Sequence, residues 1–119
     1  MSSIINLPLF SDERGSLCVI EKILPFDIKR VFYIYNVKES RGGHAHKNTK
    51  QALVSIAGEC VVYANNGQTK TTYRLTKPNE VLILEPEDWH TMEFSKNCIL
   101  LVLASEYYDK EDYIYEEPK

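Results

Sequence analysis

The sequence of 119 residues is short of several features that mark other classes of protein. Its longest apolar run, Ile99 to Ala104, is far below the roughly 20 residues that a membrane-spanning helix needs, so we expect no membrane partner. The N-terminal residues 1–6 show no basic region followed by a long apolar stretch, so we expect no signal peptide. These two features predict a cytoplasmic protein.

Positive charge is neither abundant nor clustered in this sequence. The 14 Lys and Arg residues are outnumbered by 17 Asp and Glu residues, and the formal net charge is −3. Because nucleic-acid binding requires a concentrated basic face that neutralises phosphates, we expect no nucleic-acid partner.

Cysteine is also scarce. Cys18, Cys60 and Cys98 are widely spaced and show no paired-ligand spacing. Each lies among Val, Leu and Ile residues, which favours buried, reduced thiols over disulfides or zinc ligands.

The composition that remains is that of a small globular protein, with 44% hydrophobic and 26% charged residues. The length suits one domain over residues 1–119. Short β-type runs separated by turn residues dominate, and no helical period extends beyond about 10 residues. The sequence therefore predicts an all-β fold with nine strands: Ile4 to Phe10, Ser16 to Ile20, Arg30 to Val37, Gln51 to Ala57, Glu59 to Ala64, Thr71 to Leu75, Val81 to Leu84, Thr91 to Phe94 and Cys98 to Ala104.

The turns between these runs support a barrel. Asn66-Gly67 is the strongest hairpin signal, because both residues tolerate positive φ and lie between two alternating runs. Nine short strands are best accommodated by a closed or two-sheet barrel, which also removes exposed sheet edges. The tail, Ser105 to Lys119, is rich in Tyr and acidic residues. It forms either one helical turn around Asp109 to Tyr113 or a segment that wraps the barrel.

The segment Gly42-Gly43-His44-Ala45-His46 is the best candidate for a functional site. Residues two apart on an extended strand point the same way, so both imidazoles are expected on one face. A third histidine, His90, follows Trp89 much later in the chain and either completes a shared cavity or ends a strand. Trp89 either stacks on a ligand or is buried in the core.

A second alternating run, Val31 to Tyr35, supplies aromatic candidates. Tyr33 and Tyr35 share one face of this strand, and Phe32 and Ile34 share the other. One of the two faces lines the barrel interior, where the tyrosines are either core residues or site residues.

Taken together, these elements resemble the two cupin motifs: a Gly, His-x-His, an acidic residue and a Gly, followed later by a Pro and a final His. The position of the acidic metal ligand is held by Gln51, seven residues before Gly58. A neutral amide is a weak metal ligand, so we expect a metal-free site in which histidines act as acid and base.

A more specific resemblance is to the WxcM-like sugar 3,4-ketoisomerases of the FdtA and QdtA type. It rests on the segments Asp12 to Gly15, Arg30 to Tyr35, Arg41 to Lys47, Leu101 to Asp109 and Asp112 to Ile114, in this order along nearly the whole chain. The Arg-Gly-x-His-Ala-His and Leu-Ala-Ser-x-Tyr-Tyr elements carry most of its specificity.

The resemblance implies a homodimeric cupin, a double-stranded β-helix or jelly-roll barrel, that acts without a cofactor. It implies isomerisation of dTDP-4-keto-6-deoxyglucose to a 3-keto sugar, which supplies aminated deoxysugars for surface glycans such as lipopolysaccharide O-antigen, or for antibiotics. By position, the family's essential histidine falls on His46, with His44 beside it. The active-site tyrosine falls on Tyr33 and the N-terminal arginine on Arg14, which follows Glu13 where some members have an aromatic residue.

The implied reaction requires one base and one proton donor. We expect His46 to move the proton, and His44 and Tyr33 to donate to sugar oxygens. Either Arg14 or Arg41 would bind the pyrophosphate, because guanidinium groups bind its oxygens in bidentate fashion. Tyr35, Trp89 and His90 complete the predicted substrate contacts.

Three other functions remain open from the sequence. A nucleotide-sugar 3,5-epimerase would use the same barrel but leave the ketone at carbon 4. A non-catalytic sugar-binding cupin would bind without exchanging the carbon 3 proton. A cupin dioxygenase would require iron.

Overall fold

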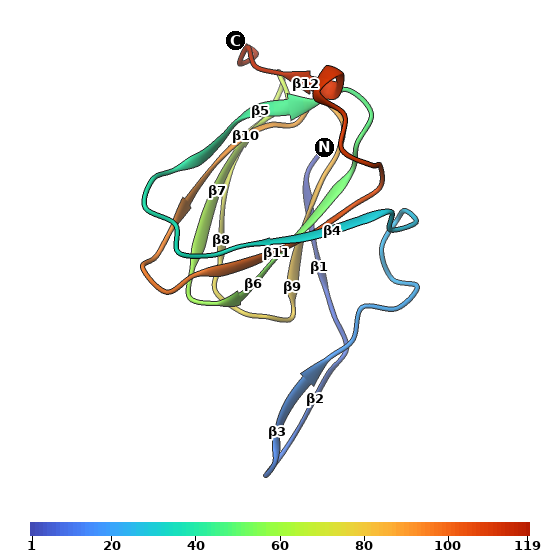
Figure 1. Ribbon diagram of the computed structural model, residues 1–119, viewed down its shortest axis with the longest axis vertical. Coiled ribbons are helices and arrows are strands. Elements are labelled where there is room, and N and C mark those ends of the chain that lie inside the picture. The colour runs from blue at the N-terminus through green and yellow to red at the C-terminus, as the bar shows by residue number, and fades with distance from the viewer.

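The structure, a computed structural model of residues 1–119, consists of twelve β-strands and one 3₁₀ turn (Figure 1). The strands are β1 (Ser3–Asn6), β2 (Leu9–Asp12), β3 (Gly15–Cys18), β4 (Arg30–Ile34), β5 (Arg41–His46), β6 (Gln51–Ala57), β7 (Cys60–Asn65), β8 (Lys70–Leu75), β9 (Glu80–Leu84), β10 (Trp89–Phe94), β11 (Ile99–Ala104) and β12 (Tyr113–Ile114), with the 3₁₀ turn η1 at Lys110–Asp112. No helix is long and apolar enough to cross a membrane.

Two five-stranded antiparallel sheets form the barrel. The first has the order β1-β9-β6-β11-β4 and the second the order β12-β5-β10-β7-β8. Figure 1 shows β6 and β11 facing β5, β7 and β10 across the interior. The predicted all-β, jelly-roll type of barrel is confirmed.

Most of the predicted strands agree with the structure to within one or two residues. The first predicted strand is divided in two, because Pro8 lacks the N–H that would continue the ladder. The segment Arg41–His46 and the short strand Tyr113–Ile114 were absent from the nine predicted strands. The Asn66-Gly67 hairpin is present, with a four-residue loop between the paired residues Asn65 and Lys70.

Buried apolar side chains from both sheets fill one part of the interior. This main core contains Leu53, Cys60, Val62, Ala64, Leu75, Leu82, Leu84, Met92, Cys98, Leu100 and Val102. A second cluster lies around Val54, Val81 and Ile83 of the first sheet, and side chains of residues 18–26 pack against it. The three cysteines form no disulfide; Cys60 and Cys98 are buried as predicted, whereas Cys18 is only partly buried.

The hairpin β2–β3 projects away from the barrel (Figure 1). Its register pairs Phe10 with Leu17 on one face and Ser11 with Ser16 on the other. Leu9, Phe10 and Leu17 are all exposed, Phe10 to 61%. This hairpin, which we call the arm, therefore leaves apolar surface open to solvent within the isolated chain.

Glycine at position 42 allows β5 to approach β10 closely. A Cβ atom at Gly42 would lie 2.7 Å from the carbonyl oxygen of His90 and 3.0 Å from the Cα of Thr91. Gly43 is the extra residue of a β-bulge, because His90 pairs with His44 whereas Thr91 pairs with Gly42. Because of this extra residue, His44 rather than Gly43 lies opposite His90.

These two glycines provide a matched test of the close approach. Both have positive φ, +93° for Gly42 and +77° for Gly43, but a Cβ at Gly43 would meet no atom within 4 Å. We expect Gly43→Ala to lower the free energy of unfolding by about 1 kcal/mol through backbone strain alone. Gly42→Ala should cost about 3 kcal/mol, because β5 must also move away from β10. Urea titration of the two variants measures both values, and equal losses would contradict this account of Gly42.

Candidate active site

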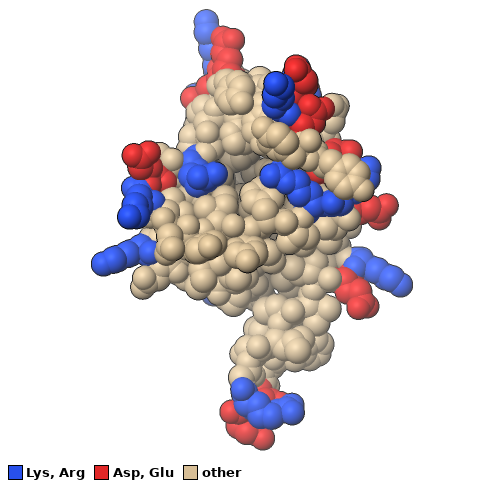
Figure 2. All heavy atoms as spheres, in the orientation of Figure 1, with Lys and Arg blue, Asp and Glu red and all other residues tan.

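A cavity of about 530 Å³ opens into the barrel between the two sheets. This volume lies within the range of small-molecule sites. Residues of β4, β5, β6, β10 and β11 line it, together with Ser40 just before β5 and two tyrosines of the C-terminal segment: Arg30, Phe32, Ile34, Ser40, Arg41, Gly42, His44, Gln51, Leu53, His90, Met92, Val102, Tyr108 and Tyr113. Figure 2 shows basic side chains on both sides of a hollow in the upper part of this face.

All three histidines of the chain gather at this cavity. The ring centroid of His44 lies 5.1 Å from that of His46 and 5.0 Å from that of His90. His44 and His90 line the cavity. His46 lies behind them, packed against the ring of Tyr113 at 4.6 Å, and is only 6% exposed. The alternation of the extended strand β5 puts His44 and His46 on one face, as the sequence predicts, and the pairing of β10 with β5 brings His90 opposite His44.

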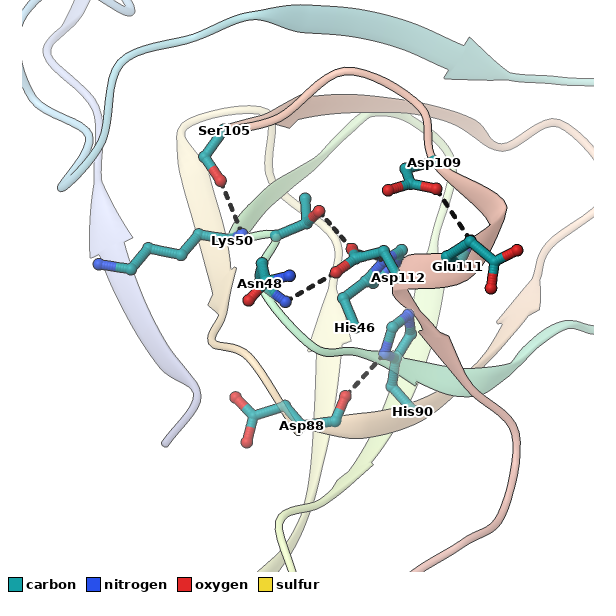
Figure 3. A network of polar contacts seen from close by, with 10 residues as sticks. His46, Asn48, Lys50, Asp88, His90, Ser105, Asp109, Glu111 and Asp112 are labelled. Atoms are coloured by element: carbon teal, nitrogen blue, oxygen red, sulfur yellow. Dashed lines mark hydrogen bonds and ion pairs between the residues drawn. The ribbon is translucent and has the colours of Figure 1, made fainter.

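His46 is held by a carboxylate from a distant part of the chain. Its Nδ1 lies 3.0 Å from the Oδ2 of Asp112, which follows it by 66 residues (Figure 3). Its other ring nitrogen, Nε2, is buried and has no hydrogen-bond partner in the chain. His90 is oriented differently, with its Nδ1 3.0 Å from the backbone oxygen of Asp88 (Figure 3).

The environment keeps these imidazoles neutral. Burial lowers the pKa of His90 to about 4. Burial also lowers the pKa of His44, and the neighbouring His46 lowers it further. For His46 burial again lowers the pKa, and the hydrogen bond and charge of Asp112 offset only part of this effect. Neutral imidazoles can accept a proton at neutral pH, as a general base must.

Two arginines bring positive charge to the cavity. Arg41 lies at the start of β5, and Arg30 lies at the start of β4. The guanidinium carbon of Arg30 is 4.4 Å from the ring centroid of Phe32 and 5.3 Å from that of Tyr108. These cation–π contacts hold a cation at the cavity wall, where an anionic ligand would meet it.

The structure does not bring Tyr33 and Tyr35 to this cavity. Period two places the pair on one face of β4, but that face is the outer one, and the two side chains are 63% and 57% exposed. Phe32 and Ile34 occupy the inward face instead. The phenolic hydroxyls of the cavity come from Tyr108 and Tyr113 of the C-terminal segment.

Trp89 and Arg14 also lie outside the cavity. Trp89 precedes the inward His90 on β10, so its ring points outward, where its Nε1 donates to the backbone oxygen of Tyr115 at 3.1 Å. Arg14 lies in the turn of the arm with its side chain 86% exposed and paired with Asp12. Of the predicted site residues, the cavity therefore unites His44, His90 and Arg41, with His46 directly behind.

Several residues of the site were not predicted from the sequence. The carboxylate of Asp112 and the rings of Tyr108 and Tyr113 come from the tail, for which the sequence allows either a helical turn or a wrapping segment. Both occur, because η1 covers Lys110–Asp112 and β12 then pairs with β5. Arg30, at the start of β4, could have been predicted from the sequence, because it lies two residues before Phe32 and therefore shares its face of the strand.

Comparison with known proteins identifies the family. The family model described as "FdtA: WxcM-like, C-terminal" matches residues 1–119. The chain belongs to this family. It is 45% identical over 118 residues to a TDP-4-oxo-6-deoxy-α-D-glucose-3,4-oxoisomerase of Aneurinibacillus thermoaerophilus, covering 95% of this chain and 85% of that protein.

Solved structures of FdtA-type ketoisomerases have the same fold. A 3,4-ketoisomerase from Helicobacter canadensis is 39% identical with a TM-score of 0.92, over 97% of this chain and 90% of that one. The WlaRB TDP-quinovose 3,4-ketoisomerase from Campylobacter jejuni is 40% identical with a TM-score of 0.92, over 97% and 92%. The predicted family, cupin fold and isomerase class are confirmed.

A 3,5-epimerase, RmlC from Legionella pneumophila, is similar in fold alone. It is 15% identical with a TM-score of 0.81, over 94% of this chain and 70% of that one. The epimerase alternative therefore shares the barrel with this FdtA-family chain, but the closer sequence similarity is to ketoisomerases.

The low pKa of His90 predicts acid sensitivity. In the unfolded chain His90 takes up a proton near its ordinary pKa of 6.5, but in the folded chain only near 4. Stability is therefore complete above about pH 6.5 and falls as the pH drops towards 4, by about 2 kcal/mol between pH 7 and pH 5. In His90→Gln, the same interval should cost clearly less unfolding free energy, as measured by urea titration at the two pH values. An equal pH dependence in both proteins would show that burial does not lower the pKa of His90.

Proposed function

We propose that residues 1–119 form one catalytic domain that converts dTDP-4-keto-6-deoxyglucose to a dTDP-3-keto-6-deoxyhexose. The observation that carries this proposal is the cluster of three neutral histidines at the end of a ligand-sized cavity, in a chain of the FdtA family. A related ketoisomerase, QdtA from Thermoanaerobacterium thermosaccharolyticum, has been solved with TDP and, as a His-to-Asn variant, with TDP-4-keto-6-deoxyglucose.

The reaction needs only the transfer of protons. A base removes the proton from carbon 3 while a donor protonates the carbonyl oxygen on carbon 4, which gives the enediol. A proton then returns to carbon 4 as the hydroxyl on carbon 3 loses its proton and becomes the new carbonyl. The substrate is neither oxidised nor reduced overall, so this chemistry requires no nicotinamide or flavin. One positioned base typically contributes about 10²- to 10⁴-fold in rate.

The geometry suggests a role for each polar residue. His46 is the base, because its Nε2 has no partner within the chain and its Nδ1 is held by Asp112. His44 and Tyr113 donate hydrogen bonds to the sugar oxygens. Tyr113 takes the role that the sequence suggested for Tyr33, since its ring lies 4.7 Å from His44 and burial raises the pKa of its hydroxyl, which keeps the proton in place.

The pyrophosphate would be bound by arginine. Arg30 and Arg41 both line the cavity and offer guanidinium groups suited to phosphate oxygens. His90 supports the cavity floor. Trp89, held against the tail, would act by fixing that tail rather than by stacking on the substrate.

A metal ion is not part of this proposal. Gln51 lines the cavity with a neutral amide, and one nitrogen of His46 is already engaged by Asp112. No group of three His, Cys, Asp or Glu side chains is arranged to hold a metal ion. Activity should accordingly persist after EDTA treatment.

The arm supports a homodimer. Its exposed Phe10 and Leu17, which pair on one face, need a cover that the barrel of the same chain does not supply, and a two-fold dimer is the commonest way to provide one. Arg14 at the tip of the arm would then reach a pyrophosphate only in the cavity of the second subunit. We propose a cytoplasmic location, in line with three unpaired cysteines, and a role in supplying deoxysugars for glycans such as O-antigen.

Substitution of the histidines tests the proposed chemistry. With dTDP-4-keto-6-deoxyglucose, His46→Asn should lose essentially all turnover and the exchange of the carbon 3 proton in deuterated water, while TDP affinity stays unchanged. His44→Asn and Tyr113→Phe should each lower kcat about 10²- to 10³-fold, because each removes a donor to developing negative charge. Proton NMR of EDTA-treated protein follows both product and exchange.

Tyr33→Phe is the matched control for Tyr113→Phe, because it removes the same hydroxyl from the outer face of β4. We expect wild-type activity for it. Full exchange in His46→Asn would move the base to the cavity-lining His44. An inverted sugar that keeps its ketone at carbon 4 would establish an epimerase, and tight binding without exchange in the wild type would establish a binding protein.

The dimer prediction depends on the apolar face of the arm. Light scattering at micromolar concentration should give twice the chain mass of 13.8 kDa for the wild type. Phe10→Glu places a charge on that face and should give a monomer with an intact barrel. Ser16→Glu adds the same charge to the opposite face of the arm and should remain dimeric. A monomeric wild type would contradict the proposal.

A further inference from the structure

The carboxylate of Asp112 accepts three hydrogen bonds, although it is only 6% exposed. Its Oδ2 accepts from the hydroxyl of Thr49 at 2.5 Å and lies 3.0 Å from the Nδ1 of His46. Its Oδ1 accepts from the backbone N–H of Asn48 at 2.8 Å (Figure 3). Burial alone would raise the pKa of Asp112, but these hydrogen bonds together hold it below the usual value. The carboxylate is therefore ionised and can only accept.

An acceptor at this place determines the tautomer of His46. A neutral imidazole carries one N–H, and a hydrogen bond to the acceptor-only Oδ2 requires that the hydrogen be on Nδ1. The lone pair available for proton abstraction is then on Nε2, the nitrogen that has no partner in the chain.

The backbone around Asp112 fixes the carboxylate in place. The N–H of Lys47 donates to the backbone oxygen of Asp112 at 2.7 Å, and β12 pairs Tyr113 with His46. Farther along, the Asn65 amide donates to Glu117 at 3.0 Å and to the backbone oxygen of Pro118 at 2.9 Å, and the Tyr63 hydroxyl donates to Glu117. We call residues 109–118 the C-terminal strap. They include η1 and β12 and run from there to the outer side of β7.

We propose that Asp112 is a positioning residue that, held by the C-terminal strap, fixes His46 as the Nδ1–H tautomer with Nε2 free as the catalytic base. This inference rests on the proposed function in that it takes His46 as the base. It assigns to the strap an active part in the site, since neither β5 nor the cavity walls supply a carboxylate to this imidazole.

The other groups that face His46 cannot replace this carboxylate. They are His44 on the same strand, His90 on β10, Tyr113 on β12 and the cationic Arg30 on β4. None of them carries a negative charge at neutral pH. Asp112 is therefore the one neighbour that raises the proton affinity of His46 and orients its ring.

Asp112→Asn tests the inference sharply. The backbone N–H of Asn48 requires a carbonyl oxygen at the Oδ1 position, so the new NH₂ group would face His46. It would donate to Nδ1 and favour the opposite tautomer, with hydrogen on Nε2. We expect kcat to fall about 10³- to 10⁴-fold, the size of effect that a wrong tautomer causes in a serine protease triad, with TDP affinity unchanged.

Proton–nitrogen correlation NMR of ¹⁵N-histidine-labelled protein reads the tautomer directly. The wild type should show the Nδ1–H form of His46 and Asp112→Asn the Nε2–H form. The acidic limb of the kcat profile should also move to lower pH in the variant, because removal of the carboxylate lowers the proton affinity of His46. Asp109→Asn is the matched control: it makes the same change in the same turn, where Asp109 caps η1 by accepting from the N–H of Glu111. It should keep the wild-type tautomer and rate.

Either of two results would overturn the inference: an Nε2–H tautomer in the wild type, or an Asp112→Asn variant that keeps more than about a tenth of the activity. The first measurement decides the matter even if Asp112→Asn fails to fold. A wild type with the Nδ1–H tautomer but no turnover of the keto sugar would instead refute the proposed function and leave the role of Asp112 intact.

Discussion

The close contact between β5 and β10 is the constraint on which the site depends. Gly42 allows the two backbones to meet, and the bulge at Gly43 brings His44 opposite His90. His46 follows on the same face, and β12 then adds to the free edge of β5 and delivers Asp112 and Tyr113. Two residues without side chains thus set the positions of three imidazoles, a carboxylate and a phenol.

This arrangement meets two requirements of a proton-transfer site with different parts of the fold: the imidazoles must be free of protons, and the base must still have enough proton affinity to remove one. The barrel interior removes water and keeps the imidazoles neutral, which favours bases that are free of protons at neutral pH. The buried carboxylate works against part of this effect at His46 alone. As a result, three chemically identical side chains within 7 Å have different partners: a backbone oxygen for His90, a carboxylate for His46 and the open cavity for His44.

Local sequence patterns predicted the parts of the site that depend on local geometry. The spacing of His44 and His46 determines that they share a face, and this holds for any extended strand. The same rule paired Tyr33 with Tyr35 but could not say which face of β4 turns inward, because Phe32 and Ile34 suit the interior equally well. Asp112 escaped prediction since its contact with His46 spans 66 residues and arises from strand addition by a two-residue strand. The fold class was easier to predict, because alternation repeated over many strands averages out such local ambiguity.

The C-terminal strap also affects how the protein can lose its activity. β12 is an edge strand of two residues, so both sheets can keep their other strands paired when it detaches. A chain whose strap has come away therefore still has its barrel, but the imidazole of His46 is without its carboxylate. Local opening at one sheet edge thus inactivates the site without unfolding of the whole protein.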